Sequence, residues 1–230
     1  CLDLPDKVYI KRSVELTEEQ KSVYNSLKTF ALALLEDGSV TTDTILTQLL
    51  RLQQVCSGHV KMDDGEMKTF NSAKLPELMS VLEEVDGKVI IWANFTHDIK
   101  TIEQEISKMY GAETAATYYG ETESDERQAI VNRFQDPDSP LKYFIGQPRT
   151  GGYGLTLTEA KTVIYYSNNF DLEIRLQSED RAHRIGQTSK VTYIDIVADK
   201  TVDDKILLAL RNKINIASQV LAEDFRDWIV

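Results

Sequence analysis

Short apolar runs alternate with amphipathic runs through the middle of this chain, and this alternation most constrains its fold. Lys88 to Ala93 (KVIIWA), Leu141 to Ile145 (LKYFI) and Thr162 to Tyr166 (TVIYY) are short and rich in β-branched and aromatic residues, as buried strands are. Thr96 to Tyr110 and Ser124 to Phe134 have helical periodicity and lie between them. Apolar strands separated by helices are typical of a parallel sheet covered on both faces. The sequence therefore predicts an α/β fold of this kind.

The segment before this alternation predicts a strand and two helices. Leu4 to Leu16 alternates like a strand, and Thr17 with Gln20 forms a capping-box signature that begins a helix. A second helix is expected from Asp43 to Ser57, ended by Gly58. A polar stretch that follows favours an exposed turn or hairpin.

The predicted domain organisation has three parts. Residues 1–71 form the strand and helical lead-in, and 72–200 form the α/β core. Residues 201–230 form a C-terminal helix and tail that joins the core as one structural unit. The helix is expected to span Thr201 to Leu221, because apolar residues recur on one face over this length.

The charge and cysteine content exclude several functional classes. The formal net charge of −11 argues against a free-standing nucleic-acid-binding domain, although a local basic strip can exist on an acidic body. Cys1 and Cys56 form no disulfide framework, and Cys56 near His59 lacks two further ligands for zinc. No run approaches the ~18 apolar residues of a membrane span, so we expect no membrane partner.

The stretch from Gln177 to Gln187 (QSEDRAHRIGQ) carries two arginines three residues apart. If the stretch is helical, Arg181 and Arg184 leave one face and converge on one small target, which should be an anion. Such pairs are also common on solvated helices, where they form ion pairs with neighbouring carboxylates. His183 would point away from both arginines, which favours a structural hydrogen bond over acid–base chemistry.

The same stretch matches the pattern QxxDRxHRxGQ at seven positions: Gln177, Asp180, Arg181, His183, Arg184, Gly186 and Gln187. It thereby resembles the sixth motif of the SWI/SNF-type DNA-dependent ATPases, a branch of helicase superfamily two. The resemblance implies a C-terminal RecA-like lobe in which Arg184 and Arg181 reach the triphosphate of an ATP. Arg184 would be the arginine finger, because a planar cation with five donors suits the charge on a transferring phosphoryl group. Gln177 would sense the nucleotide.

The glycine-rich loop from Gly146 to Thr158 (GQPRTGGYGLTLT) is the second informative stretch. Its glycines allow backbone N–H groups to approach an anion closely, although similar loops also serve as plain connectors. The loop resembles the fifth motif of the same family, STxAGGxGxNL. That resemblance places Gly154 and Thr156 near the nucleotide.

The resemblance also places Arg149, Thr150 and Gly151 of this loop on a DNA backbone. The loop departs from the family pattern at three positions. Gln147 and Pro148 stand where the family has Ser-Thr, and proline offers neither a hydroxyl nor an N–H. Thr156 replaces an asparagine near the ribose. Arg149 is therefore the best single candidate for a contact to DNA.

Two further loops supply candidate DNA contacts by resemblance. VIIWANF resembles the fourth motif, in which Asn94 would lie near the DNA backbone; equally, Asn94 could cap the next helix while Trp92 packs in the core. In YYGETESDERQ, Thr122 could bring a hydroxyl to a phosphate, and Arg127 could pair with carboxylates or touch DNA.

The resulting hypothesis is the second motor lobe of an ATP-dependent double-stranded DNA translocase. ATP and Mg²⁺ would be held mainly by an N-terminal RecA-like lobe, because this chain lacks a GxxxxGK[ST] run and an acidic DExH-type run. The chain also begins without Met, so we expect that lobe to lie upstream, and the chain alone to hydrolyse no ATP. Duplex DNA and that lobe are the expected partners.

Two alternatives remain open. One is a non-catalytic interaction module, in which a helicase-derived lobe binds a protein partner through its C-terminal helix; Pro148 and Thr156 favour it slightly. The other is a strand-separating helicase, which the DRxHRxGQ pattern disfavours. We expect a cytoplasmic location in a bacterium or phage-infected cell, or a nuclear one if the source is eukaryotic.

Overall fold

The computed structural model describes residues 4–36, 41–62, 64–150, 154–213 and 228. The chain divides into two compact units. The first comprises Cys1–Arg12, Leu78–Asn169 and Glu173–Ile196, and the second comprises Ser13–Glu77, Phe170–Leu172 and Val197–Val230.

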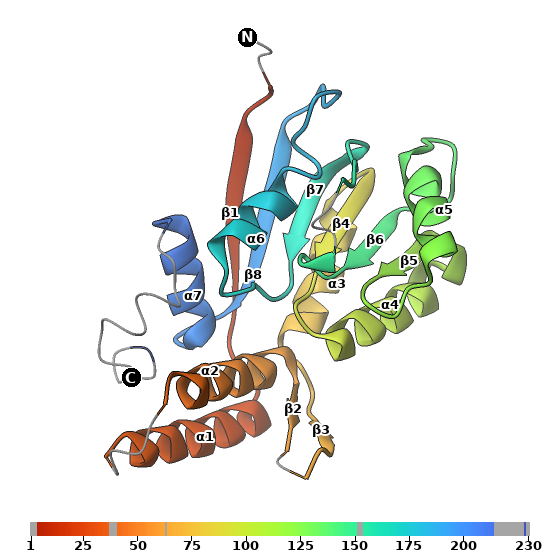
Figure 1. Cartoon of the computed structure of the whole chain (residues 1–230). Coiled ribbons are helices and arrows are strands. Elements are labelled where there is room, and N and C mark those ends of the chain that lie inside the picture. Colours follow the sequence, from red (N-terminus) through yellow and green to blue (C-terminus); the bar gives the residue numbers. More distant parts are fainter. Residues whose placement is uncertain (1–3, 37–40, 63, 151–153, 214–227, 229–230) are drawn as a thin grey trace. The chain divides into compact units, whose positions relative to one another are not determined.

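A six-stranded sheet with the order β1-β8-β7-β4-β6-β5 dominates the first unit (Figure 1). The neighbouring pairs from β8 to β5 are all parallel. This confirms the predicted parallel sheet. The strands are β1 (Lys7–Val14), β4 (Lys88–Trp92), β5 (Ala115–Tyr118), β6 (Tyr143–Gly146), β7 (Ala160–Tyr165) and β8 (Val191–Ala198).

The register of the central strands brings their carboxyl ends together. Trp92 at the end of β4 pairs with Gly146 of β6 and with Tyr165 of β7. The loops after these strands therefore open at one edge of the sheet, where parallel α/β sheets bind ligands. Close packing supports this edge, because a Cβ atom on Gly146 would lie 2.9 Å from the Tyr118 carbonyl oxygen.

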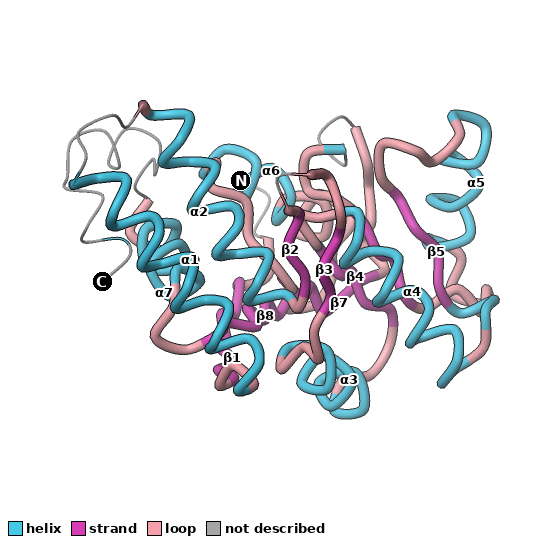
Figure 2. Tube along the Cα trace, turned by 90° about the horizontal axis from the view of Figure 1, so that it is seen from below, coloured by secondary structure: helices cyan, strands magenta, loops and turns pink. Residues whose placement is uncertain are grey.

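Helices cover both faces of this sheet, as predicted. α3 and α4 lie on one face, and α5 and α6 lie on the other (Figure 2), which is the arrangement that right-handed crossovers give for this strand order. Under α5, a core cluster includes Trp92, Phe134 and Phe144. The bounds are α3 (Lys74–Glu84), α4 (Thr96–Tyr110), the 3₁₀ turn η1 (Ala112–Thr114), α5 (Ser124–Gln135) and α6 (Leu172–Glu179).

The second unit is mainly helical. α1 and α2 lie side by side (Figures 1 and 2). The core cluster of the second unit includes Leu49, Leu52 and Ile206. The predicted hairpin is confirmed, since β2 and β3 pair antiparallel. The elements are α1 (Glu18–Glu36), α2 (Thr42–Ser57), β2 (His59–Lys61), β3 (Met67–Thr69) and α7 (Val202–Arg211).

Local signals in the sequence account for the helix ends in this unit. The backbone N–H of Gln20 donates to Thr17 Oγ1 (3.2 Å), and the Thr17 N–H donates to Gln20 Oε1 (3.1 Å), which confirms the capping box. Gly58 ends α2 with φ of 102°, as expected of a left-handed cap. Cys56 is fully buried in the core.

The C-terminal helix is shorter than predicted within the described residues. α7 ends at Arg211, and Asn212 follows as its cap. The rest of the predicted span, 214–221, lies outside the described residues. In the part of the chain that the structure covers, none of the helices is long and apolar enough to cross a membrane.

Candidate functional site

The segment that carries Arg181 and Arg184 is not helical, which corrects the expectation from their spacing. α6 ends at Glu179, and turns and bends follow as far as Gly186. The Arg181 carbonyl, which a continuing helix would use within itself, accepts the backbone N–H of Leu157 at 2.9 Å. A hydrogen bond to the glycine-rich loop therefore replaces helical bonding. We call residues 180–187 the arginine segment.

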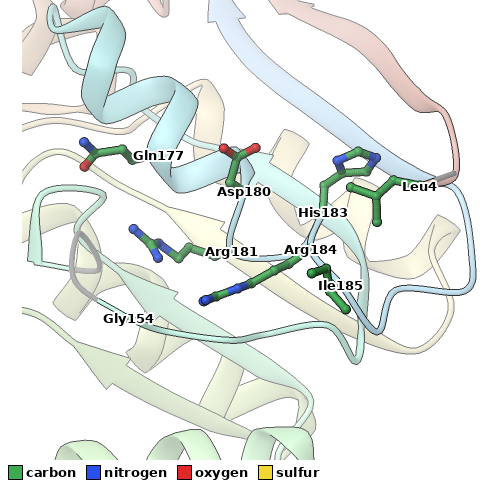
Figure 3. Close-up of a pocket in the computed structure, with 8 residues that line it drawn as sticks. All are labelled: Leu4, Gly154, Gln177, Asp180, Arg181, His183, Arg184 and Ile185. Carbon is green, nitrogen blue, oxygen red and sulfur yellow. The ribbon is translucent and has the colours of Figure 1, made fainter. Parts of the chain in front are cut away.

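Both arginines nevertheless line one hollow of about 480 Å³. Figure 3 shows their guanidinium groups extending on the same side, toward the loop that carries Gly154, while the carboxylate of Asp180 points away. The convergence predicted from an i, i+3 spacing is thus reached through turns. The hollow is lined by Leu4, Gly154, Gln177, Asp180, Arg181, His183, Arg184 and Ile185.

The two arginines differ in burial. Arg181 is 9% exposed, and its pKa lies below the ordinary arginine value, first because of burial and then because of the positive charge of Arg184. Arg184 is exposed. Its Nη1 donates to Thr156 Oγ1 at 3.3 Å and to the Leu155 carbonyl at 3.5 Å. Two like charges on one hollow repel each other, and a bound anion would relieve that repulsion.

Gln187 ties the arginine segment to the glycine-rich loop. Its buried side-chain amide donates to the carbonyls of Thr158 (2.9 Å), Ala160 (3.1 Å) and Ala182 (3.2 Å). The side-chain oxygen of Gln187 accepts the N–H of Ser189 at 2.9 Å. The fifth and sixth motif-like stretches are therefore one hydrogen-bonded structure.

The other predicted nucleotide residues lie at the same place. Gln177 lines the hollow, and its amide donates to Glu173 Oε1 at 2.9 Å. Gly154 also lines it with φ of 76°, a conformation that favours glycine. Thr156 contacts Arg184 as above. His183 Nε2 lies 2.6 Å from the Pro5 carbonyl oxygen, which confirms the expected structural hydrogen bond.

The predicted DNA residues of the glycine-rich loop lie at the carboxyl edge of the sheet. Arg149 is exposed just after β6. Thr150 Oγ1 donates to Gln147 Oε1 at 3.4 Å, and Gln147 Nε2 donates to the Asn94 carbonyl at 3.2 Å. Arg149 and Asn94 therefore belong to adjacent loops. Gly151 lies outside the described residues.

Asn94 does not cap α4, which corrects one of its two predicted roles. The cap position is Phe95, whose side chain makes no capping bond. The Asn94 amide oxygen instead accepts Asn169 Nδ2 at 2.9 Å. The other expectation for this loop is confirmed, since Trp92 is fully buried.

The Thr122 hydroxyl points into the protein. It donates to the Thr117 carbonyl (3.2 Å) and accepts the Tyr119 N–H (3.0 Å). Arg127 donates to the Thr122 carbonyl at 3.0 Å and to the carbonyls of Tyr119 and Gly120. These two side chains are thus bonded within their own turn and, unlike Arg149, offer little to a ligand outside it.

Sequence reasoning missed a buried polar network beneath α6. Arg175 is 6% exposed and contacts Asp195 of β8, which is fully buried, as well as Asn168 and Glu179. Two signals pointed to it. Arg175 and Glu179 are four residues apart, and Asp195 interrupts an otherwise apolar strand.

Metal ligation is not supported within the described residues. They hold no group of three or more His, Cys, Asp or Glu side chains that could bind a metal ion. The site described above consists mainly of guanidinium and amide donors, which suit phosphate oxygens.

The family of this chain follows from its similarity to known proteins. Residues 72–186, half of the chain, match the model of the helicase conserved C-terminal domain. The chain belongs to this family. The match contains the glycine-rich loop and both arginines, so the site described above is part of a helicase C-terminal domain.

Relatives of the chain include a regulator of chromatin and a subunit of a chromatin structure-remodeling complex. The SWI/SNF-related matrix-associated actin-dependent regulator of chromatin subfamily A member 1 of Homo sapiens is 28% identical over 234 residues, which cover 96% of this chain and 22% of that protein. The chromatin structure-remodeling complex subunit snf21 of Schizosaccharomyces pombe is 25% identical, with coverage of 95% and 20%. The chain thus spans about a fifth of the length of these relatives.

Solved structures agree in fold. The Sulfolobus solfataricus SWI2/SNF2 ATPase core in complex with dsDNA matches with a TM-score of 0.74 and 28% identity, covering 98% of this chain and 48% of that one. The C-terminal part of the Fun30 ATPase domain matches with a TM-score of 0.77 over 99% of this chain and 97% of its own, at 20% identity. The predicted RecA-like fold and the resemblance to the C-terminal lobe of SWI/SNF-type ATPases are confirmed.

Proposed function

We propose that this helicase C-terminal domain is the second motor lobe of an ATP-dependent double-stranded DNA translocase. One observation carries the proposal. Arg181 and Arg184 line a single hollow together with Gly154 of the glycine-rich loop, and this hollow lies in a domain that is similar to a SWI2/SNF2 ATPase core. Its chemistry suits the triphosphate of an ATP.

The arginines act on the transferring phosphoryl group. Arg184 is exposed and can reach a nucleotide held outside the lobe, whereas Arg181 is anchored by burial. Charge spreads over the phosphoryl oxygens in the transition state, and a planar cation stabilises it. We therefore assign the arginine-finger role to Arg184 and a supporting electrostatic role to Arg181.

In this proposal, two lobes share the contacts to one ATP molecule. An N-terminal RecA-like lobe holds ATP and Mg²⁺, and the chain alone is inactive. The residues of this chain suit the side of the triphosphate that faces away from the N-terminal lobe. The hollow offers guanidinium donors and the side-chain amide of Gln177 to the phosphate oxygens. ATP with Mg²⁺ supplies the phosphoryl group; this chain orients and stabilises it.

DNA contacts centre on Arg149 in this proposal. Its exposed side chain follows β6 at the edge of the sheet where ligands bind, and it can bind a phosphate without reading bases. Thr150 and Asn94 lie at the same edge and would contact the DNA backbone beside Arg149. Gly151 is assigned to the DNA contact by resemblance only. Thr122 contributes to the shape of its own turn, because its hydroxyl is engaged internally.

A protein partner and the cellular location are also matters of proposal. Leu208 on α7 is 60% exposed, which makes this helix the place where we propose a partner to bind. A cytoplasmic location is proposed for a bacterial or phage source, and a nuclear one for a eukaryotic source.

The test is the ATPase rate of the full-length protein, with and without double-stranded DNA. We expect duplex DNA to stimulate hydrolysis. Arg149→Ala should weaken DNA binding and lower the dependence of log K on log salt by about one unit. Lys161→Ala, which removes an exposed positive charge near the start of β7, is the matched control. It should change neither the affinity for DNA nor the salt dependence of that affinity.

Two results would overturn the proposal. One is an ATPase rate that duplex DNA leaves unchanged. The other is complete absence of hydrolysis by the folded full-length protein, which would favour the non-catalytic interaction module.

A further inference from the structure

Arg175 lies at the centre of a buried network of hydrogen bonds beneath α6. Arg175 Nε donates to Glu179 Oε1 at 2.9 Å, and its Nη1 donates to Asn168 Oδ1 at 2.6 Å. Nη1 and Nη2 also bind the two carboxylate oxygens of Asp195, at 2.5 and 3.2 Å. The guanidinium lies 3.5 Å from the ring centroid of Tyr165. One arginine thus connects α6, β7 and β8.

The network continues from Arg175 to the last residue of α6. Glu179 Oε2 accepts the hydroxyl of Tyr9 at 2.7 Å and the ammonium of Lys7 at 3.2 Å. The backbone carbonyl of Glu179 accepts the hydroxyl of Tyr193 at 2.8 Å. Both ends of Glu179 are therefore held, the side chain by three donors and the backbone by a tyrosine from β8.

Glu179 is also the residue from which the arginine segment departs. Its carbonyl accepts the backbone N–H of Ala182 at 3.3 Å and of His183 at 3.2 Å. A shift of Glu179 would consequently move the turn that carries Arg181 and Arg184. Lys7 reinforces the turn, because its ammonium also contacts Asp180 at 3.3 Å.

Burial makes this arrangement rigid. Glu179 and Asp195 are 3% and 0% exposed, and buried ions are costly unless they are fully paired. Loss of Arg175 would remove both hydrogen bonds that its guanidinium donates to Asp195 and the one that it donates to Glu179, so the two buried carboxylates would lose their shared cation. Such a network fixes geometry more than it adds stability.

We propose that Arg175 is a positioning residue for the nucleotide-facing arginines: through Glu179 it fixes where the arginine segment leaves α6. It contacts no nucleotide itself. The inference rests on the proposed ATPase function, in which a transition-state cation must be placed accurately. Misplacement of a catalytic group by about 1 Å can reduce turnover by about 10²-fold.

The main test is Arg175→Lys in the full-length protein. Lysine keeps the charge, but its compact ammonium cannot reproduce the planar fork on Asp195 together with the bond to Glu179. We expect kcat for DNA-stimulated ATP hydrolysis to fall by about 10²-fold, while the KM for ATP changes by less than about threefold. Amide hydrogen exchange of residues 180–187 should accelerate, and exchange of α4 should stay at the wild-type rate.

A milder pair of variants covers the case in which Arg175→Lys disturbs the whole lobe. Tyr9→Phe removes one hydroxyl that donates to Glu179, from a residue that is 48% exposed. Tyr24→Phe is the matched control, because its hydroxyl accepts the N–H of Val202 in the second unit. We expect Tyr9→Phe to accelerate exchange of residues 180–187 and to lower kcat, and Tyr24→Phe to do neither.

The proposal is overturned if a folded Arg175→Lys protein keeps both wild-type kcat and wild-type exchange of residues 180–187. It is equally overturned if Tyr9→Phe and Tyr24→Phe lower kcat to the same extent, because an equal decrease shows a general loss of stability. If the wild-type protein hydrolyses no ATP, the proposed function fails, and the exchange measurement still decides whether Arg175 positions the segment.

Discussion

At the scale of single residues, Gln187 shows most directly how the site is held together. Its buried side-chain amide donates hydrogen bonds to three backbone carbonyls, one at the end of the glycine-rich loop, one at the start of β7 and one in the arginine segment. Its place in the QxxDRxHRxGQ pattern was visible in the sequence, but its partners were not, because carbonyl contacts between distant segments have no signature in residue types.

Replacement of this glutamine by alanine should destabilise the domain. Gln187→Ala leaves buried carbonyls without their donor, which costs about 1–3 kcal/mol in the free energy of unfolding. Chemical denaturation measures this. Gln128→Ala, which removes an exposed amide that donates to Asn132, is the control and should cost much less. An equal, small effect of both variants would contradict the role given to Gln187.

A second residue-scale prediction concerns pH. Arg12 donates to both carboxylate oxygens of Glu84, at 2.8 and 2.9 Å, and this hydrogen bonding lowers the pKa of Glu84 below its ordinary value. A carboxyl whose pKa is depressed in the folded state contributes stability above its unfolded pKa of about 4.3, and that contribution disappears as pH falls through the folded pKa.

Titration of Glu84 by NMR checks this prediction. In Arg12→Ala the pKa of Glu84 should rise toward the ordinary value, whereas Arg133→Ala, which removes an exposed arginine on α5, should leave it unchanged. A Glu84 pKa that is the same in the wild type and in Arg12→Ala would show that the pair does not persist in solution.

At the scale of elements, periodicity predicted most of the fold. α4 matches its predicted span of Thr96 to Tyr110, and the buried strand β4 differs by one residue at its end. These elements are decided by burial, which the pattern of apolar residues reports. The prediction of a helix across Arg181 was wrong, because the Arg181 carbonyl accepts the N–H of Leu157 instead of a helical N–H. A local sequence pattern does not report hydrogen bonds to distant segments.

Gly146 provides an element-scale prediction. A Cβ atom at this position would lie 2.9 Å from the Tyr118 carbonyl oxygen and 3.0 Å from the Trp92 ring. Gly146→Ala should therefore push the end of β6 from its neighbours and cost about 1–3 kcal/mol of stability. Gly120→Ala, where the added Cβ meets nothing within 4 Å, is the control in thermal unfolding. Equal melting temperatures for the two variants would contradict the close packing.

At the scale of the whole molecule, charge and function must be reconciled. The chain is acidic overall, with a formal net charge of −11, yet the proposed sites are arginines at one edge of a sheet. Arg149 and Arg184 are exposed there, so local donors and not net charge would bind phosphates. The resemblance to SWI/SNF-type ATPases was available from the motifs; the buried support from Arg175 required the structure.

We propose that Arg184 of this lobe acts on the transition state of ATP hydrolysis. The most direct measurement is the single-turnover rate of ATP cleavage by the full-length Arg184→Ala protein on duplex DNA, together with its affinity for ATP. The side chain is exposed, so the variant should fold normally. Arg133→Ala serves as the control.

We predict that Arg184→Ala lowers the cleavage rate by on the order of 10³-fold, while ATP still binds and the control retains the wild-type rate. A folded Arg184→Ala protein that cleaves ATP at the wild-type rate would contradict the account, because the hollow lined by the two arginines would then have no part in catalysis.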